Sequence, residues 1–285
     1  MTSIPLPLGS VTCYFVRHGE RVDHIDADWV ANASIPYDPP LTAEGTHQAR
    51  KTGALIYNLE KQALLANPQR TEYLVLTSPF LRCAQTSEGI FHGFEQSWKQ
   101  NKADGMQDPS SWRLAVEPGL SEVMSESYFD MQIPNSLIAR RREELGDGRG
   151  IRYANDYAPV HECMPVYPEG FQNMMARFVS TLDVTATRQI DQMSRDLIAA
   201  SGNESGPLNT RRVIIFVTHG AGIGSFLWAT AKQLGFNNIT YCCVTRALVT
   251  GRKSSQPLPA FGTSRMPAYS WHVDYNAYSE HLANL

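Results

Sequence analysis

The sequence lacks a strong excess of either charge. It has 25 Lys and Arg residues against 28 Asp and Glu residues, which gives a formal net charge of −3 at pH 7. Nucleic-acid-binding domains usually carry a clear basic excess, so no direct nucleic-acid contact is expected. The basic run Arg140, Arg141 and Arg142 is followed at once by Glu143 and Glu144. This pattern is typical of a solvated face or loop.

Long apolar runs are also lacking. No stretch approaches the roughly 20 apolar residues that a membrane-spanning helix needs, so no membrane association is expected. The N-terminus lacks a charged segment followed by an apolar stretch, so the sequence predicts no secretory signal.

Cysteines are few and irregularly placed. They number five, an odd count, and their spacings fit no zinc-binding pattern. Reduced thiols that pack in the interior are therefore expected. This favours a protein of the cytoplasm, the nucleus or both.

The chain does have enough apolar residues for a large core, at 42% of 285 residues. Short apolar runs predict strands at 11–16, 73–77, 114–116, 213–217 and 241–249. Helices are expected after Thr42, at 82–91, from Glu169, at 189–200, and between the strand at 213–217 and Gly235. Alternating strands and helices predict an α/β fold with three α/β/α layers and a mostly parallel central sheet.

The domain organisation is expected to be simple. No internal repeat is visible, and residues from both ends of the sequence would build one site, which indicates a single domain over residues 1–285. Its core would cover about 11–250, with inserted segments at about 92–112 and 124–165 and a C-terminal extension at about 251–285. Mixed charge, Pro and Gly predict irregular structure with short helices in the inserted segments, and residues 251–268 are expected to form an exposed loop.

Three of the predicted strands end in residues suited to phosphate chemistry. Arg17 and His18 follow the first strand, Arg82 the second and His219 the fourth. Ligands bind at the carboxyl ends of parallel strands, and the arginine fork matches a phosphate. We therefore expect these side chains to converge on one anion, with His219 as an oxyanion partner.

His18 is the candidate nucleophile, because neutral imidazole is available near pH 7 and can carry a phosphoryl group. Its other ring nitrogen should be held protonated by a backbone carbonyl around Gly19, and Gly19 should let the backbone bend close to the phosphate. Each feature alone has an ordinary explanation: a loop, a core histidine at His219, or a surface position for Arg82.

Several segments together resemble the histidine phosphatase (phosphoglycerate mutase-like) superfamily, branch 1. The matching segments are VRHGE at 16–20, PPLT at 39–42 with Gly45 and Gln48-Ala49, TSPFLRC at 77–83 with Gln85-Thr86, VEPGLSE at 116–122 and VTHG at 217–220. Within the superfamily, Arg21, the SPFLRC and EPGLSE runs, DYAP at 156–159 and YPE at 167–169 are most similar to the Sts phosphatases. Related domains occur in a subunit of the transcription factor TFIIIC.

The resemblance implies a role for each matching residue. It makes His18 the phosphorylated nucleophile and Glu122 the proton donor, with Glu117 and Glu126 as nearby rivals. It places Arg17, Arg21, Arg82 and His219 in the phosphate pocket. It implies catalysis without a metal or other cofactor, on phosphotyrosine or other phosphomonoesters.

Three functions remain open at this level. The first is a phosphatase acting on an aryl phosphate, with a phosphorylated small molecule or phosphoprotein as partner. The second is a mutase or sugar bisphosphatase, in which Arg140 to Arg142 would hold a second anionic group. Mutases of the superfamily usually carry Ser or Thr where Arg21 stands, and its acid phosphatases usually carry His-Asp where His219-Gly220 stands. The third is an interaction subunit with weak catalysis, and both a homodimer and a place in a protein complex are compatible with the sequence.

Overall fold

The computed structural model describes residues 11–68, 70–101, 106–146, 150–200, 210–231, 239–252 and 269–283. The strands in these residues are β1 (Val11–Arg17), β2 (Arg70–Thr77), β3 (Arg113–Val116), β4 (Arg152–Tyr153), β5 (Thr210–Thr218), β6 (Val244–Arg252) and β7 (Tyr269–Tyr278). The α-helices are α1 (Trp29–Asn32), α2 (Ala43–Ala66), α3 (Leu81–Gln100), α4 (Ser136–Gly146), α5 (Phe171–Ala200) and α6 (Gly220–Ala231). Short 3-10 helices are η1 (Val22–His24), η3 (Pro109–Ser111), η4 (Pro118–Leu120) and η5 (Glu280–Leu282).

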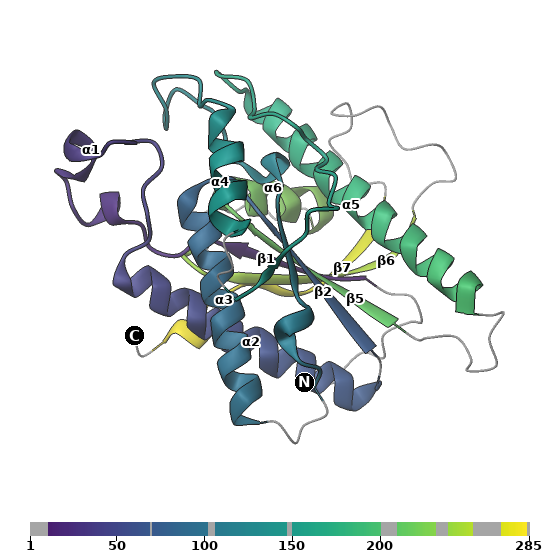
Figure 1. Ribbon diagram of the computed structural model, residues 1–285. Helices are drawn as coiled ribbons and strands as arrows, with labels where there is room; N and C mark the ends of the chain where they lie inside the picture. Colours follow the sequence, from purple (N-terminus) through teal and green to yellow (C-terminus); the bar gives the residue numbers. More distant parts are fainter. Residues whose placement is uncertain are drawn as a thin grey trace.

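The strands form one sheet in the order β4-β3-β2-β5-β1-β6-β7 (Figure 1). Neighbouring strands from β4 to β1 are parallel, whereas β6 and β7 are antiparallel to their neighbours. The predicted α/β fold with a mostly parallel sheet is confirmed.

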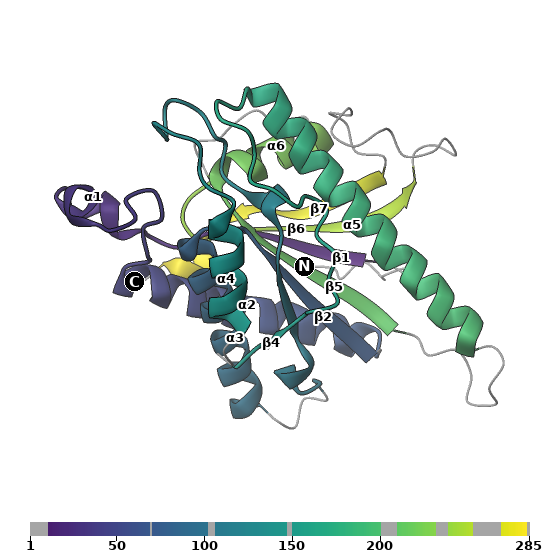
Figure 2. The ribbon, with the colours of Figure 1, turned by 45° about the horizontal axis from the view of Figure 1, so that its top comes forward.

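Helices cover both faces of this sheet. Figures 1 and 2 show α2 and α3 on one side and α5 and α6 on the other. The side chains of β1 alternate between the two cores: Tyr14 and Val16 pack on the side of α2 and α3, and Cys13 and Phe15 on the side of α5 and α6. A strand buried on both faces is apolar throughout, which explains the uninterrupted VTCYFV run.

Helix α2 begins where the sequence predicts. The Oγ1 atom of Thr42 accepts a hydrogen bond from the backbone N–H of Gly45 at 2.8 Å, which satisfies one of the free donors of the first turn. On the inner face, Ala49, Ile56 and Leu59 are buried. The cap and the apolar stripe therefore agree on the same helix.

Two helices are longer than predicted. Helix α3 continues to Gln100, so the expectation of irregular structure from residue 92 is wrong for residues 92–100. The reason is tertiary: Phe94 is fully buried and packs on Tyr57 and Trp112. Helix α5 is one continuous helix rather than two. Between the two predicted helices, the hydroxyl of Thr187 donates to the carbonyl of Asp183 at 2.8 Å, so this β-branched residue fits into the helix.

The C-terminal part adds an unpredicted strand. β6 begins at Val244 rather than Tyr241, and β7 pairs with it at the edge of the sheet. Residues 251–252, expected in a loop, lie in β6, while residues 253–268 and the predicted helix end at Gly235 lie outside the described residues. The division into core, inserted segments and extension stays a prediction.

The basic run at 140–142 lies on α4 and is not uniformly solvated. Arg141 is buried: it donates to the carbonyl of Pro79 at 2.9 Å and forms ion pairs with Asp38 and Glu144. The expectation of a solvated face is therefore wrong for Arg141, because Asp38 supplies a buried charge partner that is distant in sequence.

Candidate active site

The register of the sheet brings three strand ends to one rim. Arg17 of β1 pairs with Thr218 of β5, and Thr77 of β2 pairs with Val217 of β5. The residues that follow these strands, His18, Ser78 and His219, therefore lie side by side at the same edge of the sheet. This places His18 next to His219, with 5.3 Å between the ring centroids.

His18 is buried with one ring nitrogen engaged. Its Nδ1 lies 2.9 Å from the carbonyl oxygen of Gly19. Since a carbonyl can only accept, Nδ1 must carry the proton and Nε2 must hold the lone pair. Burial, together with the charges of Arg82 and Arg17, lowers the pKa of His18 well below its usual range. The side chain is therefore neutral at pH 7 and has the tautomer that a nucleophile at Nε2 needs.

The fold leaves no room for a side chain at Gly19. A Cβ atom there would lie 2.5 Å from the carbonyl oxygen of Gly45, at the start of α2. The Gly19 N–H also donates to Thr86 Oγ1 on α3 at 3.0 Å. The glycine thus allows the His18 loop to pack directly against two helices.

Two arginines present hydrogen-bond donors that the described chain leaves unpaired. Arg82 is 1% exposed, and its guanidinium lies 4.4 Å above the Phe80 ring. Among the described residues, neither its Nε nor its Nη1 has a partner, and the Nε of Arg17 has none either. A buried cationic donor without an acceptor is costly, and these N–H groups lie beside His18, where they are available to an anionic ligand.

The rest of the Arg17 side chain is fixed. Its Nη1 donates to the carbonyl of Ile239 at 2.7 Å, and its guanidinium lies 4.4 Å from the ring centre of Tyr241. Tyr241 also lies beside His18, with 5.7 Å between the ring centroids. No motif pointed to Tyr241 as a site residue, and it was expected only as the first residue of the strand predicted at 241–249.

Arg21 lies at the same site but is shared with a carboxylate. It forms a two-point ion pair with Asp23, in which Nε lies 2.7 Å from Oδ1. Its charge nevertheless helps to lower the pKa of His18.

His219 is fully buried and neutral. Burial and the charge of Arg82 lower the pKa of His219 well below its usual range. Its Nε2 lies 3.0 Å from the hydroxyl of Ser78, and its Nδ1 lies 3.4 Å from the Arg82 guanidinium. Ser78 and Arg82 therefore fix the orientation of the His219 ring on the same rim.

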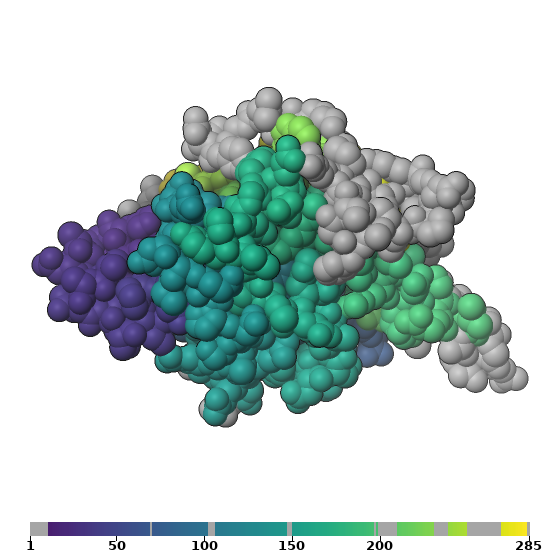
Figure 3. All heavy atoms as spheres, turned by 90° about the horizontal axis from the view of Figure 1, so that it is seen from above, coloured from purple at the N-terminus to yellow at the C-terminus, as the bar shows by residue number. Residues whose placement is uncertain are grey.

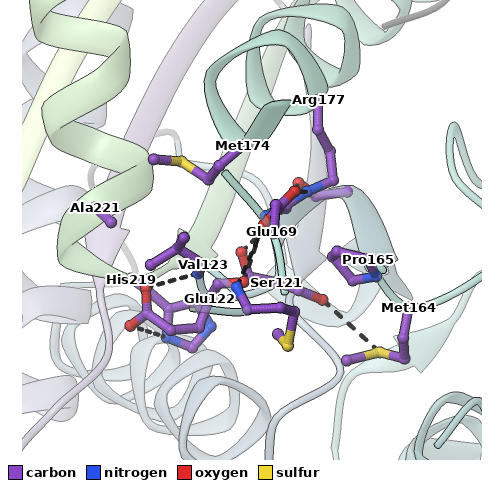
Figure 4. Close-up of polar contacts among 12 residues, drawn as sticks. Ser121, Glu122, Val123, Met164, Pro165, Glu169, Met174, Arg177, His219 and Ala221 are labelled. Carbon is purple, nitrogen blue, oxygen red and sulfur yellow. Dashed lines mark hydrogen bonds and ion pairs between the residues drawn. The ribbon is translucent and has the colours of Figure 1, made fainter. Parts of the chain in front are cut away.

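Glu122 approaches the rim from the loop after η4. Its Oε2 lies 3.4 Å from the Nδ1 of His219 (Figure 4). Burial raises the pKa of Glu122, although the charge of Arg82 opposes this shift. With His219 neutral, this contact is not an ion pair; a protonated Glu122 can instead donate to Nδ1. The site therefore holds a carboxyl group with proton-donor capacity.

The two rival carboxyl groups are placed differently. Glu117 is buried and accepts four hydrogen bonds, from the N–H groups of Gly119, Val160 and His161 and from the Tyr157 hydroxyl. All four organise the local loops. Glu126 is exposed. Of the three candidates, Glu122 alone contacts His219 in the described structure.

A cavity of about 540 Å³ opens beside these residues. Arg21, Arg82 and Glu122 form its base, and aromatic residues Tyr37, Tyr128 and Phe129 contribute to its walls. These walls come from the purple N-terminal segment, which includes α1, and from the teal middle segment beside it (Figure 3). Val30, Pro36 and Tyr37 bring the segment 24–38 into the lining, and Glu126 to Met131 bring in the inserted segment 124–165, whereas no described residue of 92–112 lines this cavity.

Two further findings concern metals and membranes. In the described ranges, no group of three or more His, Cys, Asp and Glu residues could hold a metal ion. None of the helices in those ranges is long and apolar enough to cross a membrane. The five cysteines are free. Four of them are buried, as expected, whereas Cys163 is exposed and departs from the expectation.

Comparison with known proteins gives one family match. Residues 13–103 match the model of the histidine phosphatase superfamily, branch 1. Ecdysteroid-phosphate phosphatase from Drosophila melanogaster is 27% identical over 173 residues, which cover 52% of this chain and 19% of that protein. The chain therefore matches only about a fifth of the length of this curated relative.

Solved structures share the fold over most of the chain. An ecdysone phosphate phosphatase from Bombix mori, solved in complex with tungstate, gives a TM-score of 0.52 at 18% identity and covers 87% of this chain and 97% of its own. A phosphoglycerate mutase from Bacillus anthracis str. Sterne gives 0.51 at 13% identity and covers 96% of each chain. At such identities the likeness shows the fold. The sequence likeness to branch 1 of the histidine phosphatase superfamily is carried by residues 13–103.

Proposed function

We propose that this protein hydrolyses phosphate monoesters, with a preference for aryl phosphates, through a phosphohistidine formed at His18 and without a metal ion. The unpaired, buried guanidinium donors of Arg17 and Arg82 beside a neutral His18 carry the proposal. Phosphoryl transfer needs fixed positive charge around the equatorial oxygens, an available nucleophile and an acid for the leaving oxygen. This rim offers all three.

The reaction would proceed in two balanced steps. In the first, the Nε2 lone pair of His18 attacks phosphorus, the bond to the ester oxygen breaks, and Glu122 donates a proton to that oxygen. In the second, a water molecule attacks the phosphohistidine, the P–N bond breaks, and the water's proton returns to Glu122. The proton taken from Glu122 is thus restored in each cycle.

The cavity supports an aryl or otherwise apolar leaving group. Tyr37 and Phe129 are partly buried against the core, and Phe129 stacks on Phe80 with 5.9 Å between ring centroids. Phe80 is itself buried beneath the Arg82 guanidinium, so this stack holds Phe129 near the phosphate site, where Phe129, Tyr37 and Tyr128 give the cavity an aromatic lining. A flat apolar group attached to the phosphate would pack against it.

The same cavity gives less support to a mutase or sugar bisphosphatase. Its lining includes the carboxylates of Glu126 and Asp130, which would repel a second anionic group, whereas the carboxylate of Asp23 is paired with Arg21. The three arginines that could have held such a group have other partners: Arg140 pairs with Glu144, and Arg141 pairs with both Asp38 and Glu144. Arg142 forms a hydrogen bond with Tyr153.

The direct test is turnover of 4-nitrophenyl phosphate by the His18→Ala variant. We expect loss of turnover and loss of the phosphorylated enzyme in rapid acid quench. His47→Ala is the matched control, because His47 is exposed on α2, and it should leave both unchanged. A chelator should not alter the rate of the unmodified enzyme. Full activity of His18→Ala would remove the proposal.

A further inference from the structure

The loop that carries Glu122 has no regular structure of its own. After η4 the chain runs through turns and extended segments until α4 begins at Ser136. Neither a helix nor a strand therefore fixes the backbone at Glu122. A general acid has to lie within hydrogen-bonding distance of the leaving oxygen, so its position must be fixed by other contacts.

Arg177 of α5 supplies these contacts. Its side chain is 7% exposed, and its guanidinium makes five hydrogen bonds, one for each N–H that the group possesses. Three go to backbone carbonyls of the Glu122 segment: Gly119 at 2.8 Å, Ser121 at 3.1 Å and Glu122 itself at 3.3 Å. The other two go to the carboxylate of Glu169 at 2.8 and 2.7 Å.

Glu169 extends the same contacts beyond Glu122. Its Oε2 accepts the N–H of Met124 at 3.3 Å, and its own N–H donates to the carbonyl of Met124 at 2.7 Å. The segment is thus held from Gly119 to Met124, on both sides of Glu122. Figure 4 shows Glu169 and Arg177 beside the segment formed by Ser121, Glu122 and Val123.

We propose that Arg177 and Glu169 form a clamp that positions Glu122 as the general acid. The proposal rests on the proposed function, in which Glu122 protonates the leaving oxygen. Neither clamp residue donates to substrate in this account. They are positioning residues that act through the backbone of the segment from Gly119 to Met124, which we call the acid loop.

The clamp depends on the planar fork of arginine. Lysine keeps the charge but offers one nitrogen with three donors, so Arg177→Lys cannot reach three carbonyls and both carboxylate oxygens at once. Arg177→Lys should therefore loosen the acid loop while keeping the ion pair with Glu169. Glu169→Gln is the complementary variant, because it keeps the shape but removes the charge of the carboxylate.

The test compares two substrates of similar size whose leaving groups differ in their need for an acid. Benzyl phosphate releases a basic alkoxide and requires protonation, whereas 4-nitrophenyl phosphate releases a stable phenolate. We expect Arg177→Lys to lower kcat for benzyl phosphate by roughly 10- to 100-fold and kcat for 4-nitrophenyl phosphate by less than about threefold, as a part of the contribution of general acid catalysis. Glu169→Gln should show the same preference.

Arg211→Lys is the matched control. Arg211 forms an equally buried ion pair with Glu60, at 6% and 1% side-chain exposure, but it lies near the start of β5, away from the rim that carries His219. Any rate loss caused by lower stability should affect the two substrates equally. Equal losses for Arg177→Lys and Glu169→Gln would overturn the clamp.

Glu122→Gln separates this proposal from the function on which it rests. It should show a stronger version of the same leaving-group preference, and adding Arg177→Lys to it should cause no further selective loss for benzyl phosphate. If Glu122→Gln itself lacks the preference while His18→Ala is inactive, the phosphohistidine chemistry stands and the acid role, together with the clamp, is overturned. If Arg177→Lys does not fold, the test uses Glu169→Gln alone, with the same comparison of kcat for benzyl phosphate and 4-nitrophenyl phosphate.

Discussion

The imidazole rings of His18 and His219 lie edge to face, with their centroids 5.3 Å apart, although His18 follows β1 and His219 follows β5. Both are buried beside Arg82, so both are held neutral. One ring can then act as a nucleophile while the other is oriented by Ser78 and Arg82. Their neutrality also has a measurable effect on stability.

The stability of the fold should rise with pH between about 5 and 7. The pKa of each buried histidine is lowered in the folded state, so at pH values below about 6.5 the unfolded chain binds protons that the folded chain does not. The free energy of unfolding should therefore fall on acidification, by up to about 1.4 kcal/mol per pH unit for each histidine. His18→Gln should make this dependence shallower in urea unfolding at pH 5, 6 and 7. His47→Gln serves as control, and an unchanged slope for His18→Gln would contradict the burial argument.

Replacing Arg82 should lower the phosphatase activity and raise the stability of the fold. Its buried charge has two unpaired donor atoms among the described residues, and removing such a group relieves a desolvation cost. We expect Arg82→Met to melt at a higher temperature than the unmodified protein, with kcat/KM for 4-nitrophenyl phosphate lower by about 10²- to 10³-fold. Inorganic phosphate should raise the melting temperature of the unmodified protein and not that of Arg82→Met. Unchanged activity together with a lower melting temperature would show that Arg82 is a structural residue. Arg50→Met, at an exposed position on α2, should change neither property.

Neighbouring arginines on α4 should differ sharply in their effect on stability. Arg141→Leu leaves the buried carboxylate of Asp38 without its charge partner, and breaking such a pair costs about 3–5 kcal/mol. Arg140→Leu removes an exposed pair with Glu144, which is worth less than about 1 kcal/mol. Chemical denaturation of both variants measures the difference. Similar values for the two would show that the Asp38 pair is unimportant.

The acidic wall of the cavity should discriminate against substrates with a second anionic group. Changing both Glu126 and Asp130 to their amides should lower KM for 4-(carboxymethyl)phenyl phosphate by roughly 3- to 10-fold, because the repulsion between exposed charges is removed. KM for 4-methylphenyl phosphate should stay the same, and added salt should reduce the difference between the proteins. An equal change for both substrates would exclude electrostatic selection by this wall.

The parts of the site that could be predicted are those whose residues lie in short sequence motifs. Arg17, His18, Arg82 and His219 lie in short motifs at strand ends, and a parallel sheet aligns such ends, so their convergence could be predicted. The contact of Glu122 with His219 confirms the proximity that the resemblance implied, whereas periodicity alone gave no reason to choose it over Glu117.

The missed features depend on contacts between distant segments. Phe94 stabilises the end of α3 through Tyr57 and Trp112, which no local pattern indicates. The bonds from Arg177 to the acid loop join α5 to a segment more than fifty residues earlier in the sequence. β7 is an exception: apolar and polar residues alternate along YSWHVDYNAY, and the exposure alternates with them from Trp271 to Ala277, so this strand carried a local signal that was not used in the prediction.

The place of β5 in the sheet affects how the protein can form. β5 lies between β1 and β2, so the two earliest strands of the chain have no direct pairing and must wait for one that is synthesised much later. Loops that close over such long separations slow folding. We therefore expect a ribosome-bound chain to remain without catalytic activity until β5 has emerged, because its insertion is the event that first brings His219 to His18.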